Sequence, residues 1–155
     1  MDDSNNENIF LDHIAIAVAN LDSAQKIFED IGLKFCPSRE IVISQKVVTV
    51  FAQIENKTHL ELVSPLNNDG PIQKFICKKG EGIHHLCFRV PNITDTCNLL
   101  KEKRYQIIYS EPIMGANNCL VNFIHPNSTG GILIELSEVQ VSSSSLSSQL
   151  STETI

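Results

Sequence analysis

Two histidines and two glutamates recur along the chain at nearly constant separations. The sequence numbers of His13 and His85 differ by 72, and those of Glu61 and Glu135 differ by 74. Each glutamate has apolar neighbours on both sides, and a charged side chain is rarely buried without a partner. Neutral imidazole nitrogens and carboxylate oxygens suit divalent Mn, Fe, Co, Ni or Zn and leave open positions for a substrate. These residue types at this spacing indicate one divalent metal site.

The same offset extends to the residues around these four positions. Segment 13–21 matches segment 85–93 at its His, Val and Asn and at most apolar positions, and segment 59–64 resembles segment 133–138. We interpret the pattern as an internal duplication, in which two half-domains pair around an approximate twofold axis. Taken alone, each side chain is more simply explained as a core histidine or a strand-surface glutamate. The repeat favours metal ligation by all four.

Hydrophobic periodicity predicts the same order of elements in both halves. A strand over 9–18 precedes an amphipathic helix over 21–31, and Gly32 follows as a stop signal. The second half begins with a strand over 83–90 and a helix over 93–104. The remaining predicted strands are 33–42, 46–54, 59–63, 106–109, 119–124 and 131–137, with a short helix over 71–78 between the halves. Each half is therefore a strand, a helix and three strands.

Size and charge narrow the class of protein. The 155 residues suit one domain, and 42% hydrophobic residues suffice for a core. The net charge of −6 argues against nucleic-acid binding.

The five cysteines form no CxxC pair and are predicted to be structural thiols. With no signal-like or membrane-spanning segment, we expect a cytoplasmic protein that does not bind membranes. Residues 1–8 and the Ser-rich residues 139–155 are expected to be flexible.

Further candidates lie beside the four candidate ligands and in one loop. Because successive strand side chains point to opposite faces, only one of His84 and His85 is expected to face the site. The offset of 72 selects His85, and it leaves His84 on the other face or at the edge. In the turn-rich loop, His125 is a candidate substrate contact. Ser128 and Gly130 are candidates for holding an anion through backbone N–H groups, unless the loop is a simple connection.

Several segments carry a family resemblance. The more specific are Gly82-Ile83-His84-His85 and the block from His125-Pro126 to Ile134-Glu135-Leu136, and shorter matches occur at 11–18, 45–47, 61–66 and 111–112. Over about residues 9–138 the sequence resembles the vicinal oxygen chelate superfamily, and within it most closely the methylmalonyl-CoA epimerases. The resemblance implies an α+β fold. Two tandem βαβββ modules, about 9–66 and 80–138, would form an open, cupped mixed sheet with the helices outside, often in a homodimer.

The resemblance also implies a reaction. One divalent ion (Co, Mn, Ni or Zn) would be bound by His13, Glu61, His85 and Glu135, with an acyl-CoA as substrate. Methylmalonyl-CoA would be epimerised at C2, because a metal on the thioester and carboxylate oxygens stabilises the enolate left by the departing proton. A base on one face and an acid on the other complete the inversion.

The residue that moves the proton is less well defined. Some relatives have a catalytic glutamate where this chain has Thr49, whose hydroxyl is not a base near neutral pH. The role then passes to Glu135, to Glu61 or to another residue, and Glu135 is our candidate. Asn117 and Asn118 also replace the small residues that are common in the corresponding loop.

Two other functions use the same residues. A glyoxalase I-type isomerase or lyase fits the His, Glu, His, Glu set equally well, although the rest of the resemblance favours an epimerase. In a non-catalytic small-molecule-binding module of resistance type, His13 and His85 would only line the cup. Bound metal separates the enzymes from the binding module, and exchange of the C2 proton separates the two enzymes.

Overall fold

The internal duplication is visible in the order of the elements. The structure is a computed structural model that describes residues 9–141. Its strands are β1 (Phe10–Ala17), β2 (Glu40–Val42), β3 (Val47–Gln53), β4 (His59–Pro65), β5 (Gly82–Arg89), β6 (Ile113–Met114), β7 (Cys119–Ile124) and β8 (Ile134–Val139). Its helices are α1 (Leu21–Ile31), α2 (Pro71–Lys79) and α3 (Ile93–Glu102). Each half is a βαβββ module, as predicted, and α2 lies in the connection.

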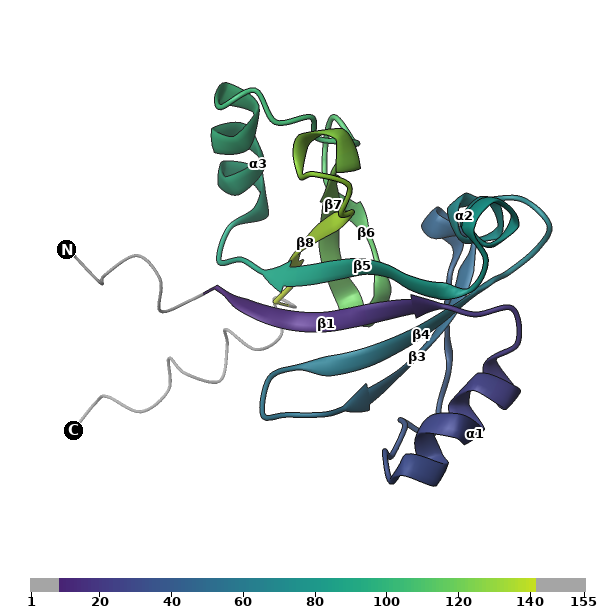
Figure 1. Cartoon of the computed structure of the whole chain (residues 1–155). Coiled ribbons are helices and arrows are strands. Elements are labelled where there is room, and N and C mark those ends of the chain that lie inside the picture. Colours follow the sequence, from purple (N-terminus) through teal and green to yellow (C-terminus); the bar gives the residue numbers. More distant parts are fainter. Residues whose placement is uncertain (1–8, 142–155) are drawn as a thin grey trace, which may run out of the picture.

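All eight strands form one curled mixed sheet in the order β2-β3-β4-β1-β5-β8-β7-β6 (Figure 1). Within each module the first and last strands pair in parallel, β1 with β4 and β5 with β8. The modules join where β1 runs antiparallel to β5. The order is the same when traced outward from this junction in either direction. An approximate twofold axis therefore passes between β1 and β5, and it relates β1 to β5 and β4 to β8.

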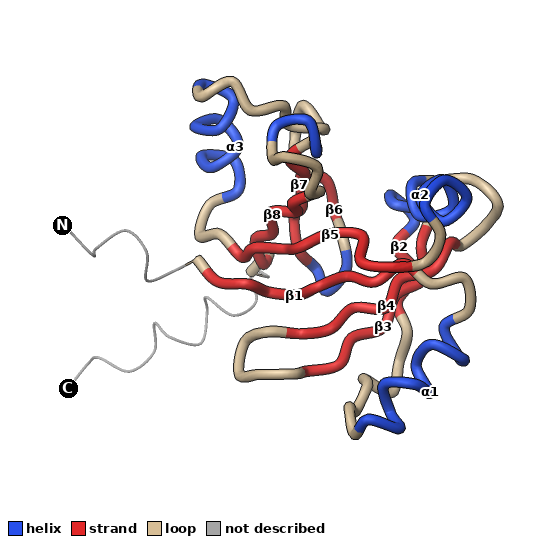
Figure 2. The backbone as a smooth tube through the Cα atoms, viewed as in Figure 1, coloured by secondary structure: helices blue, strands red, loops and turns tan. Residues whose placement is uncertain are grey.

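The two module helices begin at equivalent residues and cover the outside of the sheet (Figure 2). Asn20 and Asn92 cap α1 and α3 by accepting hydrogen bonds from the backbone N–H groups of Ser23 and Asp95. Leu21 packs on buried residues of β3 and β4, whereas Ile93 packs on Ile124 and Leu136. Burying these apolar helix faces leaves the inner, concave face of the sheet free to hold polar side chains.

Two predicted strands are largely absent. Residues 106–109 form no regular strand, and the last module's edge strand is β6 instead. Ile107 keeps a single bridge to Ile124, but the buried side chain of Asn122 bonds to both the N–H and the C=O of Tyr109 and replaces backbone pairing at that residue. Within 33–42, only β2 is a strand, because Pro37 lacks the N–H that a continuous ladder needs. Phe35 keeps a single bridge to Ala52.

The ends of the domain differ slightly from expectation. Val139 closes β8, and the Gln140 N–H donates to the carbonyl of Asn118, so the ordered chain continues past residue 138. Residues 1–8 and 142–155, predicted to be flexible, lie outside the described residues. No helix within 9–141 is long and apolar enough to cross a membrane. Of the five free cysteines, three are buried, as structural thiols should be, whereas Cys36 and Cys77 are exposed.

Candidate metal centre

The four predicted ligands come together around the twofold axis. His13 and His85 lie on the central strands β1 and β5, while Glu61 and Glu135 lie on the flanking strands β4 and β8. Glu61 is beside Ala15 in the parallel pair β1–β4, and Glu135 is beside Cys87 in the equivalent pair β5–β8. The duplication thus places one histidine and one glutamate from each module at the same point of the concave face. We call these four residues the His/Glu cluster.

Within the cluster, the donor atoms are at ligand-to-ligand distances. His13 Nε2 lies 3.2 Å from a Glu61 oxygen and 3.7 Å from a Glu135 oxygen. His85 Nε2 lies 3.6 Å from the same Glu61 oxygen and 2.7 Å from that of Glu135. The two Nε2 atoms are 3.3 Å apart. Each of the four residues is only 5–6% exposed, so these polar groups depend on one another or on a bound ion.

The donor set fits a divalent cation. Bonds of roughly 2 Å to imidazole nitrogen or carboxylate oxygen give donor separations of about 3 Å around one ion. Two neutral nitrogens and two carboxylates supply four ligands, and they balance the charge of a divalent ion. His13, His85 and Glu135 present donor atoms that lie within 4.8 Å of one another. These residues could therefore hold the metal that the sequence predicts.

Proton affinities in the cluster show how strongly its charges interact. Burial by itself raises the pKa of Glu135, but the charge of His85 and hydrogen bonds from His13 and His85 lower it to about 2. Burial raises the pKa of Glu61 too, but the hydrogen bond with His13 and the charges of His13 and His85 together lower it below its usual value. Burial disfavours the charged form of His13, yet hydrogen bonds to Asp12 and to neighbouring groups raise its pKa well above 6.5. Both glutamates are thus ionised and available to a cation at neutral pH.

Each histidine of the cluster is supported by the residue before it. Asp12 Oδ2 accepts a 2.7 Å hydrogen bond from His13 Nδ1, and His84 Nδ1 lies 2.8 Å from His85 Nδ1. Asp12 and His84 are related by the same offset as the two ligand histidines. In both pairs the contact is made by Nδ1, which leaves Nε2 facing the cluster. Hydrogen bonding of the outer nitrogen fixes the ring and the tautomer of a metal-binding histidine.

Irregularities of the β1–β5 ladder explain how consecutive side chains reach one site. The register shifts between Leu11 and His13 and again between Ala15 and Ile16, so Asp12 and His84 have no partner of their own in this ladder. Such bulges redirect a side chain next to an active site. Of the two places expected for His84, the structure supports the edge of the site, where it contacts His85 and lines the adjoining cavity. Regular strand alternation does not hold at these two residues.

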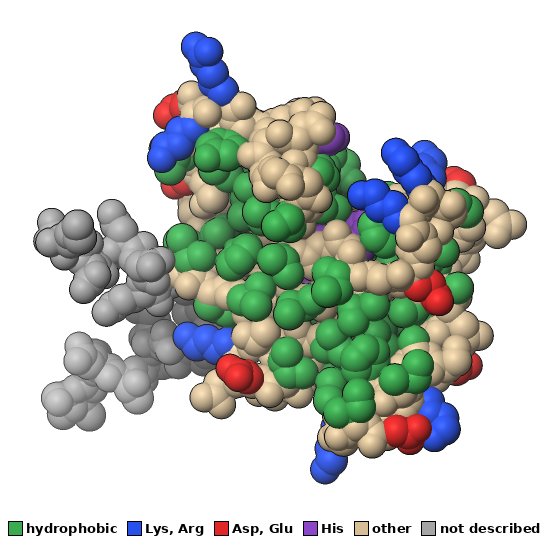
Figure 3. Space-filling view, viewed as in Figure 1, with side chains coloured by type: hydrophobic (Ala, Val, Ile, Leu, Met, Phe, Trp, Pro, Cys, Tyr) green, Lys and Arg blue, Asp and Glu red, His purple; other side chains and the backbone are tan. Residues whose placement is uncertain are grey.

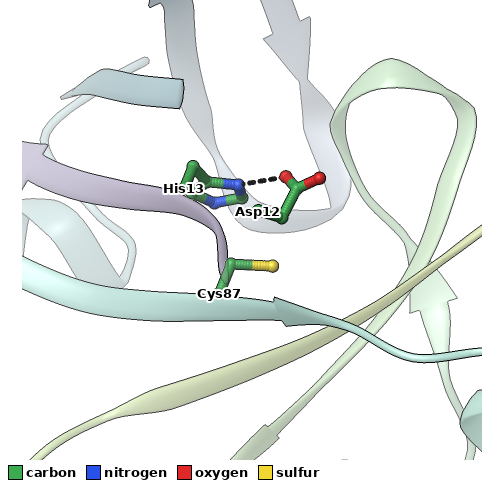
Figure 4. A group of neighbouring side chains, drawn as sticks. All are labelled: Asp12, His13 and Cys87. Carbon is green, nitrogen blue, oxygen red and sulfur yellow. Dashed lines mark hydrogen bonds and ion pairs between the residues drawn. The ribbon is translucent and has the colours of Figure 1, made fainter. Parts of the chain in front are cut away.

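Behind His13, Asp12 belongs to a second group of potential ligands that includes Cys87 (Figure 4). Burial raises the pKa of the Cys87 thiol to about 12, and only a thiolate binds metal well. Asp12 is already held by Arg89, whose Nη2 donates to Oδ1 over 2.7 Å. Asp12, Arg89 and Cys87 therefore support His13 from behind and do not form a competing metal site.

Aromatic rings enclose the cluster on both sides of the axis. Phe51 packs edge-on against His13, with ring centroids 5.4 Å apart, and Phe123 packs edge-on against His85 at 5.9 Å. The histidine offset also relates these two phenylalanines, and it is the signal by which the sequence could have identified them. Their apolar edges limit the access of water to the cluster and strengthen its electrostatic interactions.

Thr49 has a clear role although it is no base. Its Oγ1 lies 2.5 Å from Glu61 Oε1 and 3.2 Å from the carbonyl of Leu62, and the residue is only 1% exposed. Oε2 of the same glutamate faces His13 and His85. The threonine hydroxyl therefore donates to one carboxylate oxygen and orients the other toward the centre of the cluster.

Replacing Thr49 by valine should lower the free energy of unfolding by about 1–3 kcal/mol, because Glu61 loses a buried donor while the volume is unchanged. Metal affinity should fall with it. Urea denaturation and metal titration check both effects. Thr49→Ser is the matched control, since it retains the hydroxyl and should preserve metal affinity. A valine variant that binds metal as tightly as the serine variant would contradict the positioning role.

Three cavities lie next to the His/Glu cluster. An apolar cavity of about 160 Å³ is lined by Glu61, His84 and His85, and a smaller one of about 30 Å³ by His13, Glu61 and Glu135. A larger cavity of about 490 Å³ extends from His84 and His85 to α2. The cluster is therefore buried, but cavities large enough for a small ligand lie beside it.

The predicted loop contacts are only partly close to these cavities. His125 lines the largest cavity, whereas Ser128 and Gly130 do not. The Ser128 hydroxyl accepts from the N–H of Gln106, and its own N–H donates to the carbonyl of His125. Gly130 has the left-handed φ of 75° that the turn requires. The turn uses its own donors, which favours a simple connection around Ser128 and Gly130 and keeps His125 as a candidate contact.

Comparison with known proteins gives the family. A model of the Glyoxalase/Bleomycin resistance protein/Dioxygenase superfamily matches residues 12–123. The mitochondrial methylmalonyl-CoA epimerase of Bos taurus is 36% identical over 129 residues, which cover 83% of this chain and 73% of the relative. Thus the resemblance found in the sequence extends over most of both proteins.

Solved structures agree with this relationship. The crystal structure of methylmalonyl-CoA epimerase from Mycobacterium tuberculosis is similar with a TM-score of 0.80 and 33% identity, covering 89% of this chain and 91% of that one. A methylmalonyl-CoA epimerase in complex with methylmalonyl-CoA and NH4+ has a TM-score of 0.82 and 26% identity, covering 87% and 97%. These relatives are isomerases, and the chain belongs to the glyoxalase, bleomycin resistance protein and dioxygenase superfamily, in the methylmalonyl-CoA epimerase family.

Proposed function

We propose that the protein epimerises methylmalonyl-CoA at C2, with one divalent metal ion bound by His13, Glu61, His85 and Glu135. The observation that carries the proposal is the convergence of these four buried side chains, two from each module, beside an apolar cavity of about 160 Å³. The named relatives, one of them solved with methylmalonyl-CoA, support the substrate class.

The bound ion would supply positive charge where the thioester and carboxylate oxygens of the substrate become more negative as the C2 proton leaves. The chain's own residues position the reacting groups. Asp12 and His84 hold the ligand histidines by Nδ1, and Thr49 holds Glu61. Phe51 and Phe123 limit the access of water to C2 of the substrate, so the C2 proton is transferred to and from protein groups.

Glu135 is our candidate for the group that accepts the C2 proton. Both oxygens of Glu61 are engaged, Oε1 by Thr49 and Oε2 by the histidines. The ion pairs of Glu135 with His13 and His85 both use Oε2, and no ion pair within residues 9–141 uses Oε1, so Oε1 is the candidate proton acceptor. Ionised at neutral pH, Glu135 is in the state that a base requires.

The decisive experiment measures exchange of the C2 hydrogen of methylmalonyl-CoA in D2O, followed by NMR, with the chelated protein before and after addition of Co or Mn. We expect exchange only with metal, together with an increase in thermal stability, since a ligand at 100 times its Kd stabilises the folded state by about 2.7 kcal/mol. No bound ion and no stabilisation would reject metal-dependent catalysis. Metal binding with turnover of a hemithioacetal, and no C2 exchange, would replace the proposal with a glyoxalase.

A further inference from the structure

The largest cavity has a basic wall that the proposed chemistry does not use. One face of α2, formed by Pro71, Lys74, Phe75, Lys78 and Lys79, lines the cavity of about 490 Å³. These positions recur at spacings of three and four, as a single helix face does. Ile72 and Ile76 pack into the core beneath the helix, and Phe75 contacts both this core and the cavity. The lysines are therefore held in place along the cavity by the buried side of α2.

A continuous wall of rings links the His/Glu cluster to this helix. The ring centroids of His85 and His84 are 5.1 Å apart, and those of His84 and Phe75 are 4.8 Å apart. Lys79 Nζ lies 5.8 Å from the centroid of Phe75. The apolar cavity beside the cluster shares Pro71, His84 and His85 with the large one. A ligand anchored at the cluster can thus extend along Phe75 to the lysines.

The lysines of this wall form no direct ion pair within the described residues, although Asp69 lies near enough to Lys74 to feel its charge. Among the described residues that line the large cavity there is no Asp or Glu. Within residues 9–141, the ion pairs made by lysine use Lys26 and Lys46, which are elsewhere. Figure 3 shows basic side chains gathered over α2 beside a gap in which histidine is visible. Three such ammonium groups at one cavity are unusual in a chain of net charge −6, and they suit a phosphate-bearing ligand.

We infer that Lys74, Lys78 and Lys79 bind the phosphate groups of the CoA moiety. The inference rests on the proposed acyl-CoA substrate. The acyl end lies at the His/Glu cluster, and the pantetheine arm crosses the apolar part of the cavity by Phe75 and Leu133. The diphosphate and 3′-phosphate then meet the three ammonium groups at the end of α2. The helix accordingly determines affinity for CoA, whereas the cluster determines the chemistry.

The test compares two triple variants that change the net charge equally. The first is Lys74→Gln, Lys78→Gln, Lys79→Gln. The control removes three exposed lysines that line no part of this cavity, Lys34→Gln, Lys57→Gln, Lys103→Gln. Calorimetry with free CoA should show a Kd about tenfold higher or more for the first variant and little change for the control, because only the first loses contacts between ammonium and phosphate groups. Methylmalonyl-pantetheine, which lacks the nucleotide, should show the same KM for both variants.

The outcomes separate this inference from the proposed function. CoA binding can be measured without turnover. If the protein does not exchange the C2 hydrogen but binds CoA through α2, the proposed reaction is wrong and the phosphate site still holds. A protein that exchanges normally while the α2 variant retains wild-type affinity for CoA overturns the phosphate site alone. Equal weakening in both triple variants would assign the effect to general charge and would likewise overturn it. Unchanged circular dichroism checks that the variants are folded.

Discussion

Replacing Glu135 by alanine is expected to abolish metal binding and to lower the rate of C2 exchange by about a thousandfold or more. The change removes a buried carboxylate that lies 2.7 Å from His85 Nε2 and 3.7 Å from His13 Nε2. Glu135 is both a proposed metal ligand and the candidate base, and its loss also removes an anionic partner that the two histidines share. Metal content of the purified protein and NMR exchange in D2O measure the two effects.

Two companion variants make this expectation specific. Glu135→Gln keeps an oxygen that can bind metal but cannot accept a proton, so it should retain part of the metal while exchange is lost. His84→Ala removes a group that supports His85 from outside the cluster, and it should be milder, since outer hydrogen-bond partners contribute about 10–100-fold. If His84→Ala and Glu135→Ala had equal effects, the assignment of His85 as the ligand and His84 as its support would be wrong.

The metal-free protein is expected to lose about 3 kcal/mol of unfolding free energy as the pH falls from 4.5 to about 2. Glu135 has a pKa of about 2 in the folded state against 4.5 ordinarily, so its contribution is complete above pH 4.5 and is lost as acid protonates it. The lowered pKa of Glu61 acts in the same direction. Urea denaturation in chelator at several pH values measures the change.

His13 contributes a pH dependence of the unfolding free energy that has the opposite sign. Because its folded-state pKa is raised above 6.5, its contribution is complete below pH 6.5 and is lost as the pH rises through that higher value. Without metal, the protein should be most stable between about pH 4.5 and 6.5. A bound divalent ion requires the unprotonated imidazole, so stabilisation by metal should grow with pH. In Glu135→Gln the acidic loss should be much smaller; an unchanged acidic loss would show that other carboxylates cause it.

The repeat predicted the cluster because duplication preserves position as well as residue type. The two modules and the parallel pairs β1–β4 and β5–β8 follow from it, and so does the meeting of His13, Glu61, His85 and Glu135. The same offset relates Asp12 to His84 and Phe51 to Phe123, although these pairs were not identified in advance. Asp12 and His84 are different residue types, so the sequence does not show that they are equivalent. Their contacts with His13 and His85 show that both support a histidine of the cluster.

Local patterns failed where a distant side chain decided the backbone. The segment 106–109 has the composition of a strand, but it keeps only a single bridge to β7, because Asn122 occupies both backbone groups of Tyr109. Similarly, Thr49 looked like a missing base, and its hydrogen bond to Glu61 depends on the antiparallel register of β3 and β4. No local sequence pattern predicts either contact, since each depends on how separate segments of the chain pair.

By itself the sequence predicted the two-module fold, the meeting of two histidines and two glutamates, and the choice of His85 over His84, because all of these follow from the period of the repeat. Tertiary structure decided what surrounds them. Bulges in the β1–β5 ladder turn Asp12 and His84 toward the ligand histidines, and packing of Ile72 beneath α2 aligns its lysines along the cavity. Bulges and helix faces depend on what each strand or helix packs against, and that is set only when the chain has folded.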